Sequence, residues 1–527
     1  MRIPRMTRRG FVHLMGAGAV VSLSTQVVSC ANASSRSAHD GPTIKSGRRF
    51  HLCLSPDAVD ADPDLLPTVQ RAGVTTIWIT GFLYGHWYYP PERIQNLRAH
   101  IQRLGMEAHV VNVPLGHPGD SLGAKSGKVP LTPPRHWRLA VRPDGSSFAG
   151  TSLHVPATAE NAEALRRLQA LGVKRVFLDD DFRLAPAPGQ IGGCFCEQHR
   201  QEFLRRYGYP DKRWAELRDD VYQRSLTPLL RDWINFTCDG LTASFRAQQA
   251  AAPKTRLGIM VMYLGAEKAG IRLTDYRGVP LRVGEEHFND RSFGSVKGKT
   301  DELFSALFHR RFVTPELAYS ESTAYPAHQL SAAHLAAKFI VSLLSDVRQT
   351  MLMSGLTPFP HAHWETLAPA IKKQVNLHAL IAGHRPRGPF KHYWGDHSRQ
   401  AGDDQPNSLF LASGVPFEVT EEPASGGWTF LSPFDAAVAA TGTLKSNGTT
   451  FVTNQDLPFA LKHQLTSQIR DVPIVQEDVP VVCAWYPTAC AALVWNLSEQ
   501  RQVLTVKLNG TRQSVTVESL DVELVRL

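Results

Sequence analysis

The feature of the sequence that most limits the possible folds is a short apolar run that ends in three carboxylates. Residues 176–178 are Val, Phe and Leu, the composition of a strand buried on both faces, and Asp179, Asp180 and Asp181 follow directly. Three unpaired negative charges cannot lie inside a core, so we expect them at the carboxyl end of the strand, where water, a ligand or cations meet them. In α/β folds that end of the strands forms the active site.

Short apolar runs alternate with amphipathic segments from Arg49 onward, which is typical of repeated βα units around a parallel sheet. The candidate strands are residues 50–54, 75–80, 108–113, 175–179, 257–262, 281–284, 317–320 and 350–353. Eight such units predict a (β/α)8 TIM barrel over residues 48–385. An open doubly wound sheet is the alternative, and it fits less well because no Gly-rich phosphate loop follows the first strand.

The composition changes after the predicted barrel. Residues 386–424 are rich in Gly, Pro, Asp and Ser, which predicts a linker region. Within residues 425–527, apolar and polar side chains alternate as in half-buried antiparallel strands, notably at 492–498, 503–508 and 514–524. We therefore expect an α/β barrel followed by a C-terminal all-β sandwich domain with no catalytic role.

Residues 1–29 predict an export signal peptide. Residues 7–11 (Thr-Arg-Arg-Gly-Phe) resemble the twin-arginine translocation motif, and an apolar stretch follows. Residues 27–30 (Val-Val-Ser-Cys) resemble a lipobox, which predicts lipidation of Cys30; an ordinary secretory signal or a membrane anchor is the alternative. Residues 30–47 then form a tether. The expected product is an exported lipoprotein, periplasmic or on the cell surface, that meets the membrane only through its N-terminal lipid.

The formal charge of +9 does not indicate nucleic-acid binding. Four arginines lie in the predicted signal, which leaves 9 − 4 = +5 for the rest, without a dense block of Lys and Arg. In an oxidising compartment Cys483 and Cys490 would form a disulfide across a hairpin, unless both are small core residues. The sequence gives no indication of an oligomeric state.

The ends of the predicted strands collect carboxylates, histidines and aromatic side chains, the composition of a sugar-binding site. The candidate substrate-binding residues are Tyr84, His86, Trp87, Asn112, Asp179, Arg183, His287, Asp290, Tyr325, His363 and Trp364. Aromatic rings stack on the apolar faces of pyranose rings, and polar groups bind the hydroxyls. A carbohydrate is therefore the expected partner.

Glycoside hydrolysis commonly needs two carboxyl groups across the scissile bond, one protonated and one ionised. Asp180 or Asp181, paired with Glu321 after the seventh strand, is the best combination, and Glu286 is a reserve candidate. Crowding of three acids raises the pKa of at least one by repulsion, which suits a proton donor. In the alternative, the acidic run caps a helix and binds nearby arginines, and Glu321 is a salt-bridged barrel carboxylate.

These segments resemble a known family. Residues 178–183 (LDDDFR) and 194–203 (CFCEQHRQEF) are similar to the segment after strand four in barrel proteins related to the family 42 β-galactosidases, and residues 319–326 (YSESTAYP) resemble their strand-seven segment. The resemblance implies a retaining mechanism with its nucleophile at Glu321. The family has Asn-Glu at its acid/base position, and this chain contains no Asn-Glu pair, so an Asp acid or an inverting geometry stays open.

The β-galactosidases also bind zinc through Cys-x-Cys-x-x-Cys, which Cys194, Cys196 and His199 resemble in spacing. Thiolate and imidazole are both good zinc ligands. The resemblance implies a possible structural zinc, with Cys53 or Cys238 as a fourth ligand, while the reaction itself requires no cofactor. In the alternative, these side chains bind nothing.

The sequence supports three alternative hypotheses about function. The leading hypothesis is an exported glycoside hydrolase. The second is a non-catalytic glycan-binding lipoprotein on a degenerate glycosidase barrel, and the third is a metal-dependent hydrolase that uses the Asp and His residues of the barrel mouth.

Overall fold

The computed structural model describes residues 47–115, 133–179, 182–284, 286–355, 357–453 and 458–527, all within one compact unit, Gly41–Leu527. The expected signal peptide, Cys30 and nearly all of the tether lie outside the described residues. Asp180 and Asp181 lie outside them as well.

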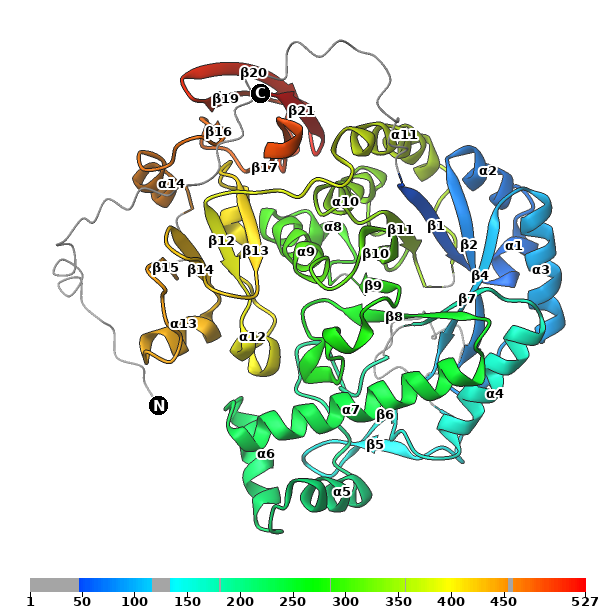
Figure 1. Ribbon diagram of the computed structural model, residues 1–527. Coiled ribbons are helices and arrows are strands. Elements are labelled where there is room, and N and C mark those ends of the chain that lie inside the picture. The colour runs from blue at the N-terminus through cyan, green and yellow to red at the C-terminus, as the bar shows by residue number, and fades with distance from the viewer. Residues whose placement is uncertain (1–46, 116–132, 180–181, 285, 356, 454–457) are drawn as a thin grey trace. The chain divides into compact units, whose positions relative to one another are not determined.

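Eight parallel strands form a closed barrel (Figure 1). They are β1 (Arg49–Leu54), β2 (Val74–Leu83), β4 (Glu107–Val113), β7 (Arg175–Leu178), β8 (Arg256–Met262), β9 (Leu281–Gly284), β10 (Ala318–Thr323) and β11 (Gln349–Met353). The ring closes because β1 pairs in parallel with both β2 and β11. The predicted (β/α)8 barrel is confirmed, and an antiparallel strand β3 (His86–Trp87) extends β2.

Helices follow the strands and lie around the barrel in Figure 1. They are α1 (Pro56–Ala61), α2 (Leu65–Arg71), α3 (Pro91–Arg103), α4 (Ala157–Ala170), α5 (Glu197–Tyr207), α6 (Arg213–Gln223), α7 (Pro228–Ala251), α8 (Asp290–Phe293), α9 (Val296–His309), α10 (Ala332–Leu344) and α11 (His363–Ile381). Side-chain caps begin several of them; the Thr227 hydroxyl, for example, accepts from the backbone of Leu230. Among the described residues, no helix combines the length and apolarity needed to cross a membrane.

The inside of the barrel has a core of its own. It is built from Cys53, Trp78, Val111, Phe177, Tyr319, Met351 and Met353, all nearly or fully buried. Alternate residues of a strand point to the same face, so Tyr319 and Glu321 of β10 both belong to the inner face. Glu321 lies one pleat closer to the carboxyl end, which places it above the apolar layer.

The residues that follow the barrel differ from expectation. Residues 390–452 form a four-stranded parallel sheet in the order β13-β12-β14-β15. Its elements are β12 (Phe390–Tyr393), α12 (Asp396–Ala401), β13 (Phe417–Thr420), β14 (Trp428–Leu431), α13 (Pro433–Ala440) and β15 (Thr450–Val452). The expected linker at 386–424 therefore holds two strands and a helix. Both strands are only four residues long, which is too short for a clear strand signal in the sequence.

The C-terminal region is antiparallel, as predicted, but it begins later than residue 425. After α14 (Pro458–Thr466), the strands are β16 (Ile474–Val475), β17 (Val481–Tyr486), β18 (Ala491–Asn496), β19 (Gln502–Leu508), β20 (Thr511–Val517) and β21 (Val522–Arg526). They form two three-stranded sheets, β16-β19-β20 and β17-β18-β21. Cys483 on β17 is a free, fully buried thiol. The predicted disulfide between Cys483 and Cys490 is therefore wrong.

Candidate functional site

Three charged side chains meet inside the barrel near the carboxyl ends of the strands. Arg282 lies on β9, Asp179 directly follows β7, and Glu321 lies on β10. The Arg282 guanidinium forms ion pairs with both acids, through Nη2 to Asp179 and through Nε to Oε2 of Glu321 at 3.0 Å. No side chain of this trio is more than 5% exposed. We call Asp179, Arg282 and Glu321 the charge cluster.

The guanidinium of the charge cluster packs against a methionine sulfur and an aromatic ring. Nη1 of Arg282 lies 2.9 Å from the sulfur of Met351, and its guanidinium lies over the ring of Phe177 at 5.4 Å. Within the cluster one cation faces two carboxylates, which leaves one negative charge in excess. A buried cation in such surroundings depends on its acids, and the acids depend on it.

Both oxygens of Glu321 have partners. The Thr323 hydroxyl, two residues further along β10, donates to Oε1 at 2.5 Å, while Arg282 faces Oε2. Strand periodicity places Thr323 on the inner face beside Glu321. These contacts fix the orientation of the Glu321 carboxylate at the mouth of the barrel.

Two predicted substrate-binding residues make structural contacts within the barrel. Asp179 binds Arg282, and its backbone N–H donates to the carbonyl of Asn112 at 2.7 Å. The Asn112 side-chain oxygen accepts from the backbone N–H of Phe82 at 2.9 Å, where the register of β2 against β4 shifts. A Cβ at Gly81 would approach that oxygen to 2.4 Å, so the close approach requires glycine. Asn112 thus stabilises a bulge in the barrel wall.

Glu286 follows β9, the strand next to β10. Burial raises the pKa of the Glu286 carboxyl; nearby His287 opposes the shift, and Asp404 and Asp301 add to it. His287 is half-buried, with its backbone N–H donating to Glu302 at 3.3 Å. A carboxyl group with a raised pKa at this edge of the barrel is suited to donate a proton near neutral pH.

Asp290 and Tyr325 join loops at the barrel mouth. Oδ1 of Asp290 accepts from the backbone N–H of Ser331 at 2.8 Å and lies 2.8 Å from Nδ1 of His334. The backbone N–H of Tyr325 donates to the carbonyl of Phe288 at 2.9 Å. The loops after β9 and β10 are therefore tied together by these two predicted substrate-binding residues.

His363 and Trp364 begin α11. Nε2 of His363 lies 3.0 Å from the carbonyl of Leu330, and Trp364 is 4% exposed, with its ring 6.4 Å from that of Phe359. Trp364 is therefore a core residue rather than a platform for a sugar ring.

The remaining predicted ligand residues divide by exposure. Tyr84 is fully buried and Arg183 nearly so. His86 and Trp87 on β3 keep part of their surface in solvent, and the Trp87 ring packs against Phe82 at 5.3 Å. Among these four, only His86 and Trp87 have exposed surface for contact with a sugar.

A second cluster lies where α5 begins. Cys196 is the N-cap of α5 and His199 lies in its first turn, while His154 follows β6 (Ser147–Thr151), which pairs with β5 (Leu139–Val141). Sγ of Cys196 lies 3.3 Å from Nδ1 of His199 and 3.8 Å from Nε2 of His154. The two imidazole rings stack with centroids 4.4 Å apart. We call His154, Cys196 and His199 the Cys–His cluster.

The spacing of the Cys–His cluster suits a zinc ion. All three ligand atoms lie within 4.8 Å of one another. Tetrahedral zinc, with bonds of about 2.3 Å to sulfur and about 2.05 Å to nitrogen, places those two atoms about 3.6 Å apart. The two sulfur–nitrogen distances lie on either side of that value. The predicted ligands Cys196 and His199 are thus brought together, with His154 in addition.

Cys194 lies beside the cluster. A hydrogen bond between the two thiols raises the pKa of Cys194 and lowers that of Cys196, and contacts with His154 and His199 lower the latter further. The thiolate form that binds metal is therefore favoured at Cys196. Cys53 lies in the barrel core and Cys238 donates to the carbonyl of Glu267, so neither is the expected fourth ligand.

Sequence reasoning missed Arg282 and His154. Arg282 stands inside a correctly predicted apolar strand, and an isolated arginine there signals a buried acidic partner. His154 lies in a loop segment with no metal-ligand spacing to the cysteines, so the sequence contains no signal for it.

Comparison with known proteins gives a likeness of fold. No family model and no curated protein matches the sequence. A β-galactosidase from Rahnella sp. R3 is 12% identical, with a TM-score of 0.57 over 91% of this chain and 98% of that one. A catalytic mutant of a family 42 β-galactosidase from G. stearothermophilus is 10% identical, with a TM-score of 0.60 over 92% and 98%. The β-galactosidase from Bacillus circulans sp. alkalophilus is 9% identical, with a TM-score of 0.60 over 91% and 99%. The chain therefore has a glycosidase-like fold, a barrel followed by β-domains, similar to that of the family 42 β-galactosidases.

Proposed function

We propose that this protein is an exported glycoside hydrolase that cleaves an oligo- or polysaccharide with carboxyl groups at the barrel mouth. The observation that carries the proposal is the placement of Glu321 at the carboxyl end of β10, held by Arg282 and Thr323 in a glycosidase-like barrel. Glu321 acts as the ionised carboxylate, either as a nucleophile or as the base that activates water.

The proton donor comes from Glu286, Asp180 or Asp181. Glu286 has the raised pKa that a donor needs, and β9 and β10 are neighbouring strands, which supports its pairing with Glu321. Asp180 and Asp181 keep the role that the sequence predicts for them. The donor protonates the glycosidic oxygen as the bond breaks, and it later receives a proton from the incoming water when Glu321 is the nucleophile.

The excess negative charge of the charge cluster supports this chemistry. Glycosidic cleavage passes through a state in which the sugar ring carries positive charge. Two carboxylates facing one guanidinium leave a net negative potential where that charge develops. His86 and Trp87, two of the predicted sugar-contacting residues, have exposed surface for stacking and hydrogen bonding.

The test is reducing-sugar release from a broad glycan panel by the purified mature protein. We expect Glu321→Gln to lower the rate of cleavage by at least about 1,000-fold. This corresponds to an increase of about 4 kcal/mol in the activation free energy. Glu286→Gln is measured beside it, and Glu365→Gln, an exposed carboxylate on α11, is the matched control. Azide added to Glu321→Ala restores turnover if Glu321 is a nucleophile, because the small anion occupies the vacated space.

We also propose that the Cys–His cluster binds a structural zinc ion. The support is the donor set, one thiolate and two imidazoles, together with the sulfur–nitrogen distances of 3.3 and 3.8 Å. Bound there, zinc would join the start of α5 to the loop that follows β6. The ion has no part in the cleavage reaction.

Export and lipidation belong to the same proposal and rest on the twin-arginine and lipobox patterns. Palmitate labelling of the full chain in its host, compared with Cys30→Ser, tests the lipid anchor. Label on the parent chain and none on Cys30→Ser is the expected result.

The principal alternative is a glycan-binding protein without activity. It is favoured by the near-complete burial of Glu321 in its ion pair with Arg282. Binding of a glycan without cleavage across the whole panel would select it. Of the residues that the structure describes, those that group as metal ligands are His154, Cys196 and His199, and none of them lies at a barrel-strand end.

A further inference from the structure

A second polar hollow lies at the opposite end of the barrel from Glu321. Its floor is formed by the end of α9, which precedes β10, and by Ser345 and Asp346, which both precede β11. Its walls come from β13 and from residues 385–387, which connect α11 to β12. The hollow is small and open to solvent.

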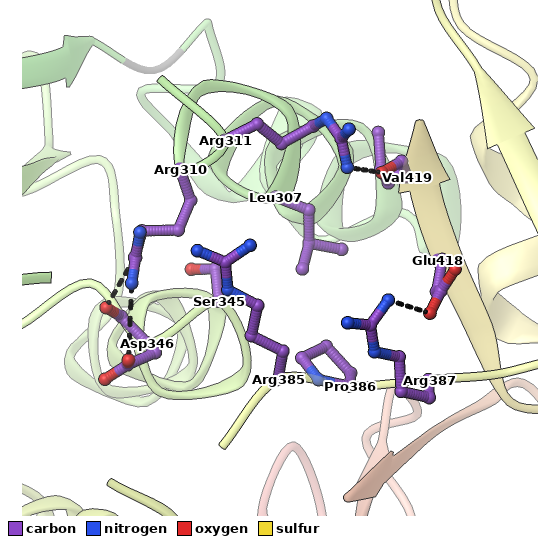
Figure 2. Close-up of a pocket in the computed structure, with 10 residues that line it drawn as sticks. All are labelled: Leu307, Arg310, Arg311, Ser345, Asp346, Arg385, Pro386, Arg387, Glu418 and Val419. Carbon is purple, nitrogen blue, oxygen red and sulfur yellow. Dashed lines mark hydrogen bonds and ion pairs between the residues drawn. The ribbon is translucent and has the colours of Figure 1, made fainter. Parts of the chain in front are cut away.

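Arginines dominate the lining, as Figure 2 shows. The charged residues are Arg310, Arg311, Arg385, Arg387, Asp346 and Glu418. Four guanidinium groups against two carboxylates leave a net charge of +2. Such an excess in a confined hollow attracts anions.

Both carboxylates already have other cationic partners. Asp346 binds Arg310, and its other oxygen lies 2.8 Å from His378 and 3.4 Å from Arg348. Glu418 accepts from Arg387 at 2.7 Å and also binds Lys391. The acids of the hollow are therefore matched without any contribution from Arg385.

Arg385 is the guanidinium without a partner. In the parts of the chain that the structure describes it forms no ion pair or hydrogen bond, although Arg310 and Arg387 do. Figure 2 shows its guanidinium in the middle of the hollow, between Arg310 and Leu307. Burial lowers the pKa of Arg310, Asp346 offsets the shift, and the nearby positive charge of Arg385 lowers it further. An anion should bind more favourably to an unpaired cation that faces a second cation than to an isolated surface arginine.

The backbone holds this arrangement in advance of any ligand. Arg385 and Arg387 flank Pro386. The backbone N–H of Arg387 donates to the carbonyl of Trp485 at 2.7 Å, which attaches the segment to β17. Proline restricts its own φ angle and the conformation of the residue before it, so Arg385 loses little backbone freedom on binding.

We propose that this hollow binds a small ligand through an oxyanion group, with Arg385 as its primary contact and Arg387 at its rim. A guanidinium presents paired N–H donors that match two oxygens of a phosphate, sulfate or carboxylate. The site lies away from the charge cluster and does not depend on the glycosidase proposal.

Isothermal titration calorimetry on the mature protein in low-salt buffer tests the site. The probes are sodium phosphate, sodium sulfate and sodium galacturonate, with sodium chloride at matched ionic strength as the reference. We expect saturable binding of at least one probe with a stoichiometry of one, weakened by added chloride. Phosphate or sulfate as the strongest probe identifies a tetrahedral oxyanion, and galacturonate identifies a carboxylated sugar.

Arg385→Gln is the decisive variant because the side chain is exposed and its loss leaves no buried group unpaired. We expect it to weaken binding about tenfold or more, the effect of losing a charge-assisted contact. Arg277→Gln is the matched control and should bind as the parent does, because Arg277 is another exposed arginine that forms no ion pair or hydrogen bond with the described residues. The proposal is overturned if no probe exceeds chloride, or if Arg385→Gln binds as tightly as Arg277→Gln.

Discussion

The charge cluster and the Cys–His cluster each bring three reactive side chains together, but they balance charge in opposite ways. In the charge cluster, Arg282 lies between two acids and every member is buried. In the Cys–His cluster, a thiol faces two imidazoles at the surface of the barrel, and each of the three keeps part of its surface in solvent. The charges of the first cluster are balanced mostly within the chain, whereas the second offers a donor set to the zinc ion that we propose for it.

The two clusters also differ in how the chain assembles them. Asp179, Arg282 and Glu321 come from three strand regions distant in sequence and meet only when the barrel closes. Cys196 and His199 lie one helical turn apart, so α5 alone brings them together, and only His154 must be added. The fold should therefore depend strongly on the charge cluster and less on the Cys–His cluster.

Arg282→Gln should have the largest effect on the stability of the fold. It leaves two carboxylates buried without a cation, which we expect to cost about 3–5 kcal/mol of unfolding free energy. Urea denaturation measures the loss. The triple variant Arg282→Met, Asp179→Asn, Glu321→Gln removes all three charges and should recover most of it. A cost below about 1 kcal/mol for Arg282→Gln would show that the acids are balanced from elsewhere.

Glu321→Gln separates stability from activity within the charge cluster. The amide keeps one oxygen to accept from Thr323 but places its NH2 group against Nε of Arg282, so we expect the unfolding free energy to fall by about 1–3 kcal/mol. Activity should fall far more, by at least about 1,000-fold. Thr323→Val is the paired control, since it removes the hydrogen bond from Thr323 to Oε1 but keeps the carboxylate. Equal losses of stability and activity in the two variants would make Glu321 a structural residue.

Removal of metal tests the other cluster. If zinc is bound, a chelator should lower stability by about 2.7 kcal/mol relative to protein kept at free zinc about 100-fold above its dissociation constant. Elemental analysis should find one zinc per chain in the parent and a strongly reduced content in Cys196→Ser and His154→Gln. Cys238→Ser, a buried thiol on α7, is the control. Zinc content that survives in His154→Gln would remove that residue from the ligand set.

The barrel could be predicted from the sequence because its strands are buried on both faces and separated by amphipathic helices. Residues 281–284 were expected as a strand and are β9, and the expected strand at 257–262 corresponds to β8. Runs of this kind carry their own local signal. The parallel sheet at 390–452 was missed because its strands are too short to show such a run.

The pairing of charges could not be predicted in the same way. The sequence places Asp179 and Glu321 at strand ends, but their common partner Arg282 is selected by the register of β7, β8 and β9 across the barrel. A shift of that register would send Arg282 to the other face of its strand. Sequence patterns reveal which strands form, and only the assembled sheet determines which side chains meet.

His51 should have the smallest effect on stability, and it shows how the barrel interior treats a charge that has no partner. His51 is 1% exposed on β1; the indole N–H of Trp78 donates to its Nδ1 at 3.1 Å, and its Nε2 lies 2.9 Å from Oε1 of Gln349. Nδ1 is thus an acceptor, and the ring is neutral. Burial lowers the pKa of His51 to about 3.

The sign of the pH effect follows from this shift. The unfolded chain takes up the His51 proton near its ordinary pKa of about 6.5, whereas the folded protein does so only near pH 3. Stability is therefore full above pH 6.5 and falls as the pH drops below it. Between pH 7.5 and pH 5.5, the titration of His51 should lower the free energy of unfolding by about 1.4 kcal/mol.

The measurement is the difference in urea midpoint between the parent and His51→Gln, because other buried histidines also titrate. His309 and His392 are buried with lowered pKa values and add to the total pH dependence. His51→Gln should flatten the profile, and His100→Gln, exposed on α3, should not. Parallel profiles for all three proteins would mean that the barrel interior accepts a charge at His51.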